Sequence, residues 1–582
     1  MWQFRVNQNN GQHSSLIDYA SGILHVLHIC HGAEYCIIRL FDSGLPQPLR
    51  SRRKSALHFL FVVIPIGVGG KWKPIIMTTY YRPEWTCGRY NDRMQTAIMY
   101  NLIEGTSFFF ESYSALVVGE ILAVPRNGHI DIDTIAEHTG IAAESIVEFA
   151  ENLIDAGLVC NRLFSKEEIR ALRIQQGRIV KEQPPQYNFK TDGQIAVSTA
   201  EEDYQNSLNC DECIPTVMFE LTYNCSERCI HCYNAGATRN DCEVSGRNRN
   251  EITLDDYKRI IDELYELGTY KVTLTGGDPF SKPDAWDIID YLYQKGIAFD
   301  IFTNGQAIAD KTERLAAYYP RLVGLSVYSG CPEIHDRITR TKGSLNKTLS
   351  VAAQLSEHGV PMAFKCVVFR TNVKSYHTVK PLARKYGAAL QIEMNLCDGV
   401  DGDTSITNHL RLPAEALEVL LRDPDVPMYI GKDRPNYGNE MKSADAYPCR
   451  AGIENLNITP DGLVTPCCTF SMPLGDIRKE SMCGILHGDA VAKWRAVRVG
   501  DMEECGRRPE CGYCYLCAGN NYLEHGTPLK ASQVSCYMAK IRYGVVQKLK
   551  AGIDPLQSKS AEERLNEMDI ADAGVFGKEI KH

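Results

Sequence analysis

Three cysteines near the middle of the 582-residue chain have a spacing that suits metal chemistry. Cys225, Cys229 and Cys232 form a C-x3-C-x2-C motif directly after an apolar run. A zinc site or an ordinary ferredoxin cluster normally takes four protein ligands, and the bacterial ferredoxin motif spaces its cysteines differently. The motif therefore predicts a metal cluster with one coordination position left for another molecule. The alternative is three unrelated thiols in a chain that has 22 cysteines.

A second concentration of cysteines lies nearer the C-terminal end. It combines a C-x12-G-x4-C pattern with a C-x5-C-x2-C-x2-C run and one further cysteine. Its members are Cys449, Cys467, Cys505, Cys511, Cys514, Cys517 and Cys536. Seven cysteines are one fewer than two complete sets of four, so Cys468 or Cys483 could complete a set, or one metal could keep an open position. A structural zinc domain is the alternative, because thiolates suit both zinc and iron.

The elements that position the first motif follow a regular alternation between 216 and 395. Apolar strand-like runs alternate with amphipathic helical patterns, which is typical of parallel βα units. The strand-like runs are 216–222, 270–275, 298–303, 322–328, 361–369 and 389–394. The helical patterns are 253–267, 282–295, 308–317, 344–358 and 373–386. Six strands are too few for a closed eight-strand barrel, and the polar motifs follow the strands, where parallel α/β folds carry their chemistry.

A small winged-helix pattern precedes this region. Two β-rich runs, 96–102 and 106–110, predict a hairpin, and three helical patterns follow at 111–124, 131–139 and 143–156. The outward face of the third helix carries Glu144, Glu148, Glu151 and Asp155. Contacts with phosphates need cations, so this face argues against insertion into DNA.

Composition limits the class of protein. The length predicts about three or four domains. A formal net charge of -9 argues against a general nucleic-acid binder. Clustered cysteines in so long a chain favour metal binding in a reducing compartment over a secreted disulfide scaffold. Because no apolar run is long enough to cross a bilayer, we expect a cytoplasmic protein without a membrane or nucleic-acid partner.

The remaining segments are predicted to connect or flank these units. Residues 1–76 show no clear periodicity, and we hypothesise that they are dispensable, as an upstream extension of the true reading frame. Residues 166–212 are polar and predict a linker, 401–447 a connector, and 546–582 a tail that is helical at first.

The motifs together resemble the radical S-adenosylmethionine (radical SAM) superfamily, whose signature is the C-x3-C-x2-C loop. Thr275-Gly276-Gly277-Asp278-Pro279 is a close variant of that family's G-G-E-P motif. The second cysteine set, within 448–545, resembles the SPASM extension that carries auxiliary iron-sulfur clusters, although its spacing departs from the commoner C-x2-C-x5-C-x3-C. Residues 77–165 resemble the leader-peptide-binding domain of pyrroloquinoline quinone biosynthesis and of many peptide-modifying enzymes. The resemblance implies an α/β fold with an open, partial (β/α)6 barrel over 213–400.

The resemblance also implies a set of site residues. Cys225, Cys229 and Cys232 would hold a 4Fe-4S cluster whose free iron binds S-adenosyl-L-methionine. Gly276, Gly277, Asp278 and Pro279 would bind the amino acid end of this cofactor, and Ser326 would contact its ribose. His231, where relatives carry an aromatic residue, is a candidate for stacking on the adenine. The seven C-terminal cysteines would hold one or two auxiliary iron-sulfur clusters.

The implied activity is the modification of a ribosomally made precursor peptide. Reductive cleavage of the cofactor, with an electron from a donor such as flavodoxin or ferredoxin, would yield a 5'-deoxyadenosyl radical that removes hydrogen from the peptide. The product could be a thioether, another crosslink or an epimer. The alternatives are a protein-residue oxidase of the sulfatase-maturase type and an iron-sulfur regulator that binds DNA through the winged helix.

Overall fold

The structure is a computed structural model that describes most of the chain after residue 78. The described residues are 79–182, 199–209, 211–234, 251–400, 402, 404–426, 428–431 and 441–571, with four strands before them: β1 (Arg5–Asn7), β2 (Val26–Leu27), β3 (Tyr35–Leu40) and β4 (Phe61–Pro65). Apart from these strands, the predicted N-terminal extension lies outside the described residues. Within the described part, no helix is long and apolar enough to cross a membrane.

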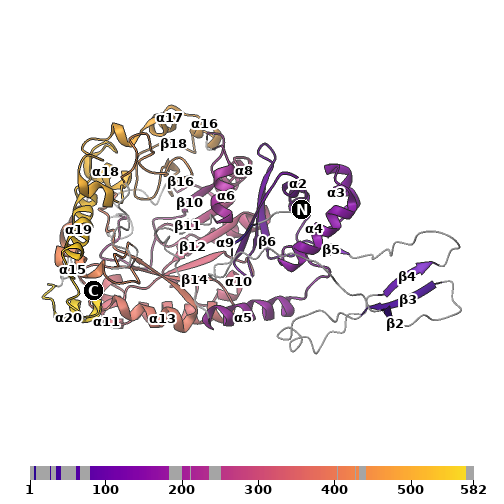
Figure 1. Cartoon of the computed structure of the whole chain (residues 1–582), viewed down its shortest axis with the longest axis horizontal. Coiled ribbons are helices and arrows are strands. Elements are labelled where there is room, and N and C mark those ends of the chain that lie inside the picture. Colours follow the sequence, from indigo (N-terminus) through magenta and orange to yellow (C-terminus); the bar gives the residue numbers. More distant parts are fainter. Residues whose placement is uncertain are drawn as a thin grey trace.

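The predicted hairpin and three helices form one N-terminal unit (Figure 1). Strands β6 (Thr86–Asn91), β7 (Thr96–Asn101) and β8 (Thr106–Glu111) make an antiparallel sheet, and β5 (Tyr80–Tyr81) pairs with β9 (His129–Ile130). The helices are α2 (Ser112–Ala123), α3 (Ile132–Thr139) and α4 (Ala143–Asp155). The side chain of Asp131 caps α3, and Gly140 ends this helix in a left-handed conformation. The apolar side of α4 packs into the core of the unit through Ile146, Phe149 and Leu153.

The segment 166–212, which the sequence predicts as a linker, contains two helices. These are α5 (Lys166–Glu182) and α6 (Ala200–Ser207). The acidic patch that suggested a linker lies in the first turn of α6, where carboxylates favour a helix. Tyr204 of α6 is buried between the N-terminal sheet and the barrel, in a cluster with Tyr100 and Tyr270. The few apolar residues of α6 favoured a linker in the sequence, but they are enough to anchor a short helix between two domains.

The predicted partial barrel is confirmed. Its parallel strands follow one another in sequence order: β10 (Thr216–Glu220), β11 (Lys271–Thr275), β12 (Ala298–Thr303), β13 (Leu322–Ser326), β14 (Met362–Val367) and β15 (Ala388–Glu393). The helices between them are α8 (Leu254–Glu266), α9 (Ala285–Lys295), α10 (Thr312–Ala316), α11 (Pro332–Thr339), α12 (Ser344–Glu357) and α13 (Val379–Tyr386). In the described part of the sheet, β15 is an edge strand, so the barrel is open on that side.

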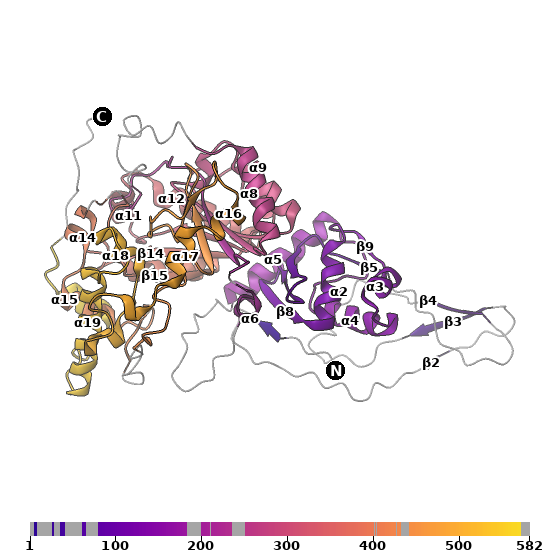
Figure 2. The same cartoon turned by 90° about the horizontal axis from the view of Figure 1, so that it is seen from above.

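The C-terminal region shares the sheet of the barrel, which the sequence did not predict. Strand β16 (Asn455–Ile458) pairs in parallel with β10 and is followed by β17 (Leu463–Thr465) and β18 (Gly475–Asp476), giving a nine-stranded sheet. Figure 2 shows the C-terminal helices beside the barrel and away from the N-terminal unit. They are α16 (Met482–Leu486), α17 (Asp489–Ala496), α18 (Ala518–His525), α19 (Gln533–Lys550) and α20 (Ala561–Glu567), while the predicted connector contains α14 (Ser405–Leu410) and α15 (Ala414–Leu420).

Candidate active site

The cysteine loop follows β10 at the carboxyl end of the barrel strands. Its backbone is held by the end of α11, because the amide of Arg228 donates to the carbonyl of Thr339 and the amide of Ile230 donates to that of Ile338. The side-chain amide of Asn304, which follows β12, donates to the Cys225 sulfur over 3.4 Å. Elements distant in sequence therefore hold the loop and supply a donor to one of its sulfur atoms.

Burial dominates the chemistry of the three thiols. It raises the pKa of Cys225 to about 12 and that of Cys232 to about 11, and it raises the pKa of Cys229 well above its ordinary value. The charges of Glu227, Cys232 and Cys225 add to the upward shift of the pKa of Cys229. Metal binding replaces the thiol protons and relieves this repulsion, so the donor set fits an iron-sulfur cluster.

No group of three or more His, Cys, Asp or Glu side chains in the described part of the chain is arranged to hold a single metal ion.

The two glycines after β11 pack directly against the cysteine loop. Gly276 has φ of 130°, and a Cβ atom there would lie 2.5 Å from the carbonyl oxygen of Thr222. A Cβ atom on Gly277 would lie 2.3 Å from the carbonyl oxygen of Asn224. Only glycine allows this approach. The structure thus gives both glycines a role in packing, and their contact with the cofactor stays a prediction.

Asp278 is fully buried and braces the neighbouring strand end. Its carboxylate accepts hydrogen bonds from the Thr303 hydroxyl over 2.6 Å and from the backbone amide of Asn304 over 3.0 Å. The Asn304 side chain in turn reaches Cys225. Asp278 therefore positions a donor to the cluster loop, and Pro279 starts a short 3-10 helix behind it.

His231 lies in an aromatic cluster at the edge of the loop. Its ring centroid is 4.6 Å from that of Tyr328 and 5.0 Å from that of Phe369. Burial, followed by the charge of His335, lowers the pKa of His231 to about 4, so the ring is neutral. Ser326 ends β13, opposite Lys365 of β14. The predicted contacts of His231 and Ser326 with the cofactor remain predictions.

The C-terminal cysteines separate into two groups. The first group contains Cys505, Cys511, Cys514 and Cys536, whose charges affect one another's pKa values. For example, burial, followed by the charges of Cys536 and Cys511, raises the pKa of Cys505 to about 11. These four line a cavity with about 600 Å³ of empty space, beside which the Arg508 guanidinium donates to the Cys536 sulfur over 3.3 Å. These four cysteines lie around one cavity, and their role as cluster ligands stays a prediction.

The second group contains Cys449, Cys467 and Cys517. Burial raises the pKa of Cys517 to about 11, with smaller effects from Cys467 and Cys449. Of the extra cysteines considered from the sequence, Cys483 is exposed on α16, 3.6 Å from His487 Nδ1. Cys397, which follows β15, lies near this group: burial, then the charges of Cys517 and Cys468, raises the pKa of Cys397 well above its ordinary value. No spacing pattern indicated it, because it comes from the barrel.

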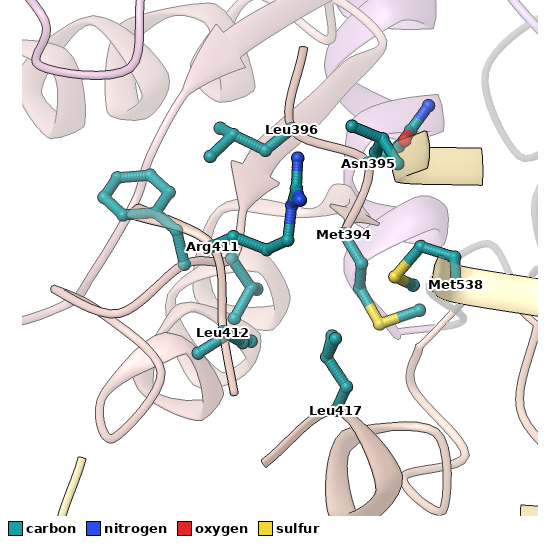
Figure 3. A pocket seen from close by; sticks show the side chains of 10 residues that line it. Met394, Asn395, Leu396, Arg411, Leu412, Leu417 and Met538 are labelled. Atoms are coloured by element: carbon teal, nitrogen blue, oxygen red, sulfur yellow. The ribbon is translucent and has the colours of Figure 1, made fainter. Parts of the chain in front are cut away.

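A pocket lies where β14 and β15 end against α19. Figure 3 shows the Arg411 side chain beside Leu396 and Met394, with Met538 across from Met394. The pocket contains about 310 Å³ of empty space and is mostly apolar. It therefore offers an apolar surface with one cation at the open side of the barrel.

Comparison with known proteins places these regions in families. Residues 219–378 match the Radical SAM superfamily, and residues 449–518 match the SPASM iron-sulfur cluster-binding domain. The chain therefore carries a region that matches the radical SAM superfamily followed by a region that matches the SPASM domain, and these matches indicate an enzyme. This confirms the predicted cofactors: S-adenosyl-L-methionine, a 4Fe-4S cluster and auxiliary iron-sulfur clusters.

Two curated relatives illustrate the similarity. The antilisterial bacteriocin subtilosin biosynthesis protein of Bacillus subtilis is 28% identical over 324 residues, which cover 53% of this chain and 68% of the relative. The mycofactocin maturase of Mycobacterium tuberculosis is 31% identical over 193 residues, which cover 33% of this chain and 46% of the relative. Among solved structures, Streptococcus suis SuiB bound to precursor peptide SuiA matches with a TM-score of 0.48 and 15% identity, over 78% of this chain and 99% of SuiB.

Proposed function

We propose that this enzyme is a maturase that removes hydrogen from a ribosomally made precursor peptide and thereby installs a crosslink or an epimer. The observation that carries the proposal is the order of three units: a winged-helix unit, a barrel with a buried cysteine loop, and a region with two further cysteine groups. The names of the relatives agree, since they include a bacteriocin biosynthesis protein, a mycofactocin maturase and a PqqA peptide cyclase.

The residues of this chain divide the work in the proposed reaction. When bound, the cluster and S-adenosyl-L-methionine supply one-electron chemistry that removes a hydrogen atom from a substrate carbon. Cys225, Cys229 and Cys232 would hold the cluster, Gly276 and Gly277 would approach the cofactor's amino acid end, and Ser326 and His231 would contact its nucleoside. The barrel would exclude water from the bound cofactor and orient the target carbon.

The winged-helix unit would bind the leader segment of the peptide. An extended peptide can add a strand beside β8, with backbone hydrogen bonds supplying affinity. The exposed face of α4 carries Glu144, Glu148 and Glu151, which favours a leader with basic residues and disfavours DNA. A cytoplasmic location and an electron donor such as flavodoxin or ferredoxin complete the proposal.

The test is mass spectrometry of a candidate precursor peptide, encoded beside the enzyme's reading frame, after anaerobic reaction with the reconstituted enzyme. Loss of two hydrogens identifies a crosslink, while deuterium uptake from heavy water without a mass change in ordinary water identifies an epimer. The matched control is Cys229→Ala, which should give no product. Formation of 5'-deoxyadenosine with an unchanged peptide would count against the proposal, and oxidation of a sulfatase peptide would favour the oxidase alternative.

A further inference from the structure

Strand β14 places a lysine in the interior of the barrel. Phe364 and Cys366 pack into the core beneath the helices, so Lys365, which lies between them, points to the opposite face of the strand. Lys365 is in register with Ser326 of β13 and with Gln391 of β15. It therefore lies inside the barrel at the level of the residue predicted to contact the cofactor's ribose.

Two neighbouring strands make room for the lysine side chain. A Cβ atom on Gly324 of β13 would lie 2.9 Å from Lys365 Cδ and 2.8 Å from Phe302 Cδ1. The Lys365 Nζ lies 3.3 Å from the centroid of the Phe302 ring. Glycine and phenylalanine thus hold the aliphatic part of the side chain in place and leave its ammonium group beside an aromatic ring.

The nearby carboxylates already have other donors. Asp300 accepts from Arg321 Nε over 2.8 Å, and Glu393 accepts from the amides of Met394 and Asn395 over 2.8 and 2.6 Å. Within the part of the chain that the structure describes, Lys365 makes no hydrogen bond or ion pair. Burial lowers its pKa to about 8, against the opposing charges of Asp300, Cys468 and Glu393. A half-buried cation without an acceptor is costly, so an acceptor from a bound molecule would stabilise it.

We propose that Lys365 is a substrate-positioning residue whose ammonium group binds an oxygen acceptor of the precursor peptide next to the carbon that loses hydrogen. This inference rests on the proposed function. The acceptor is either a side-chain carboxylate or a backbone carbonyl oxygen of the peptide. Anchoring at this level of the barrel would fix the distance between the target carbon and the cofactor, on which hydrogen abstraction depends.

The test compares Lys365→Met, which keeps the length of the side chain beside Phe302, with Lys365→Arg and with Lys385→Met. Lys385 is exposed on α13 and is the matched control. We expect Lys365→Met to load as much iron as the unaltered enzyme, but to modify peptide at least about tenfold more slowly. The ratio of 5'-deoxyadenosine to modified peptide should rise, since unanchored substrate uncouples the two. Lys365→Arg should restore part of the rate, and Lys385→Met should behave as the unaltered enzyme.

Peptide variants distinguish the two acceptors. If a carboxylate binds Lys365, changing that one acid of the peptide to its amide should slow modification by the unaltered enzyme as much as Lys365→Met does. The same peptide should be modified by Lys365→Met little more slowly than the unchanged peptide is. If no such change does, the acceptor is a backbone carbonyl. Unchanged rate and coupling in Lys365→Met would overturn the assignment alone, whereas failure of the unaltered enzyme to modify any peptide would overturn the proposed function. Should Lys365→Met load less iron, Lys365→Gln provides the same comparison.

Discussion

Glu220 is a buried residue that connects the barrel to the C-terminal region through a hydrogen bond. It ends β10, directly before the cysteine loop, and its carboxylate accepts a hydrogen bond from Asn457 Nδ2 of β16 over 3.0 Å. Burial raises the pKa of Glu220 to about 7 from an ordinary value of 4.5. The folded protein therefore favours the protonated form, and ionisation of Glu220 works against folding.

This shift predicts that Glu220→Gln changes how stability depends on pH. Because the folded pKa lies above the unfolded one, the unaltered protein loses stability as pH rises from about 4.5 to about 7. Glutamine keeps an acceptor for Asn457 but does not ionise. The free energy of unfolding of the variant, relative to that of the unaltered protein, should therefore increase by about 1 kcal/mol between pH 6 and pH 8.5. Anaerobic urea unfolding at both pH values measures the difference. The exposed Glu266→Gln is the control, and a pH-independent effect of Glu220→Gln would contradict the expectation.

At the scale of elements, the outer edge of β8 is where a leader peptide would pair. The structure pairs this edge with β1, whose residues Arg5, Val6 and Asn7 lie antiparallel to Phe109, Phe108 and Ser107. The core of the winged-helix unit is otherwise built from residues beginning at Tyr80. The chain's own N-terminal strand and a leader peptide would therefore compete for the same backbone groups.

A variant that begins at Met77 should consequently fold and should bind a leader peptide as tightly as the full chain or a few-fold more tightly. Circular dichroism and fluorescence anisotropy with a labelled leader measure the two properties, with the full chain as the reference. Loss of folding would show that residues 1–76 are needed, and weaker binding by a folded variant would show that β1 does not compete.

For the whole molecule, the position of the winged-helix unit would separate the proposed binding of the leader peptide from the site of the chemistry. Arg321, just before β13, contacts Asp300 and also approaches Glu201 of α6 within 3.3 Å. Tyr270, just before β11, packs with Tyr100 of the N-terminal sheet. These contacts hold the unit at the amino ends of the barrel strands, whereas the cysteine loop lies at their carboxyl ends.

A bound peptide must therefore span the length of the strands, which is about 20 Å for six residues. We expect that a spacer shorter than about six residues between the leader and the modified residue abolishes modification while leaving binding unchanged. Peptides with stepwise spacer deletions, assayed by mass spectrometry and anisotropy, provide the measurement, and insertions of Gly-Ser pairs are the control. Full modification of a peptide without a spacer would contradict this arrangement.

The sequence by itself determined the features that depend on near neighbours along the chain. The C-x3-C-x2-C loop, the two glycines one strand later, and the order of strands and helices all follow from local spacing and periodicity, and the structure has these elements in the predicted places. Parallel βα units bring their strand ends together, so Cys225, Gly276 and Ser326 could be assigned to one edge before the fold was known.

The tertiary structure decided what depends on contacts between distant segments. It divides the C-terminal cysteines into a group of four and a group of three, adds Cys397 beside the second group, and joins β16 to β10. It also turns a polar segment into α6 and leaves Lys365 without an acceptor among the described residues. Spacing cannot specify such features, because the packing of whole elements brings these side chains together.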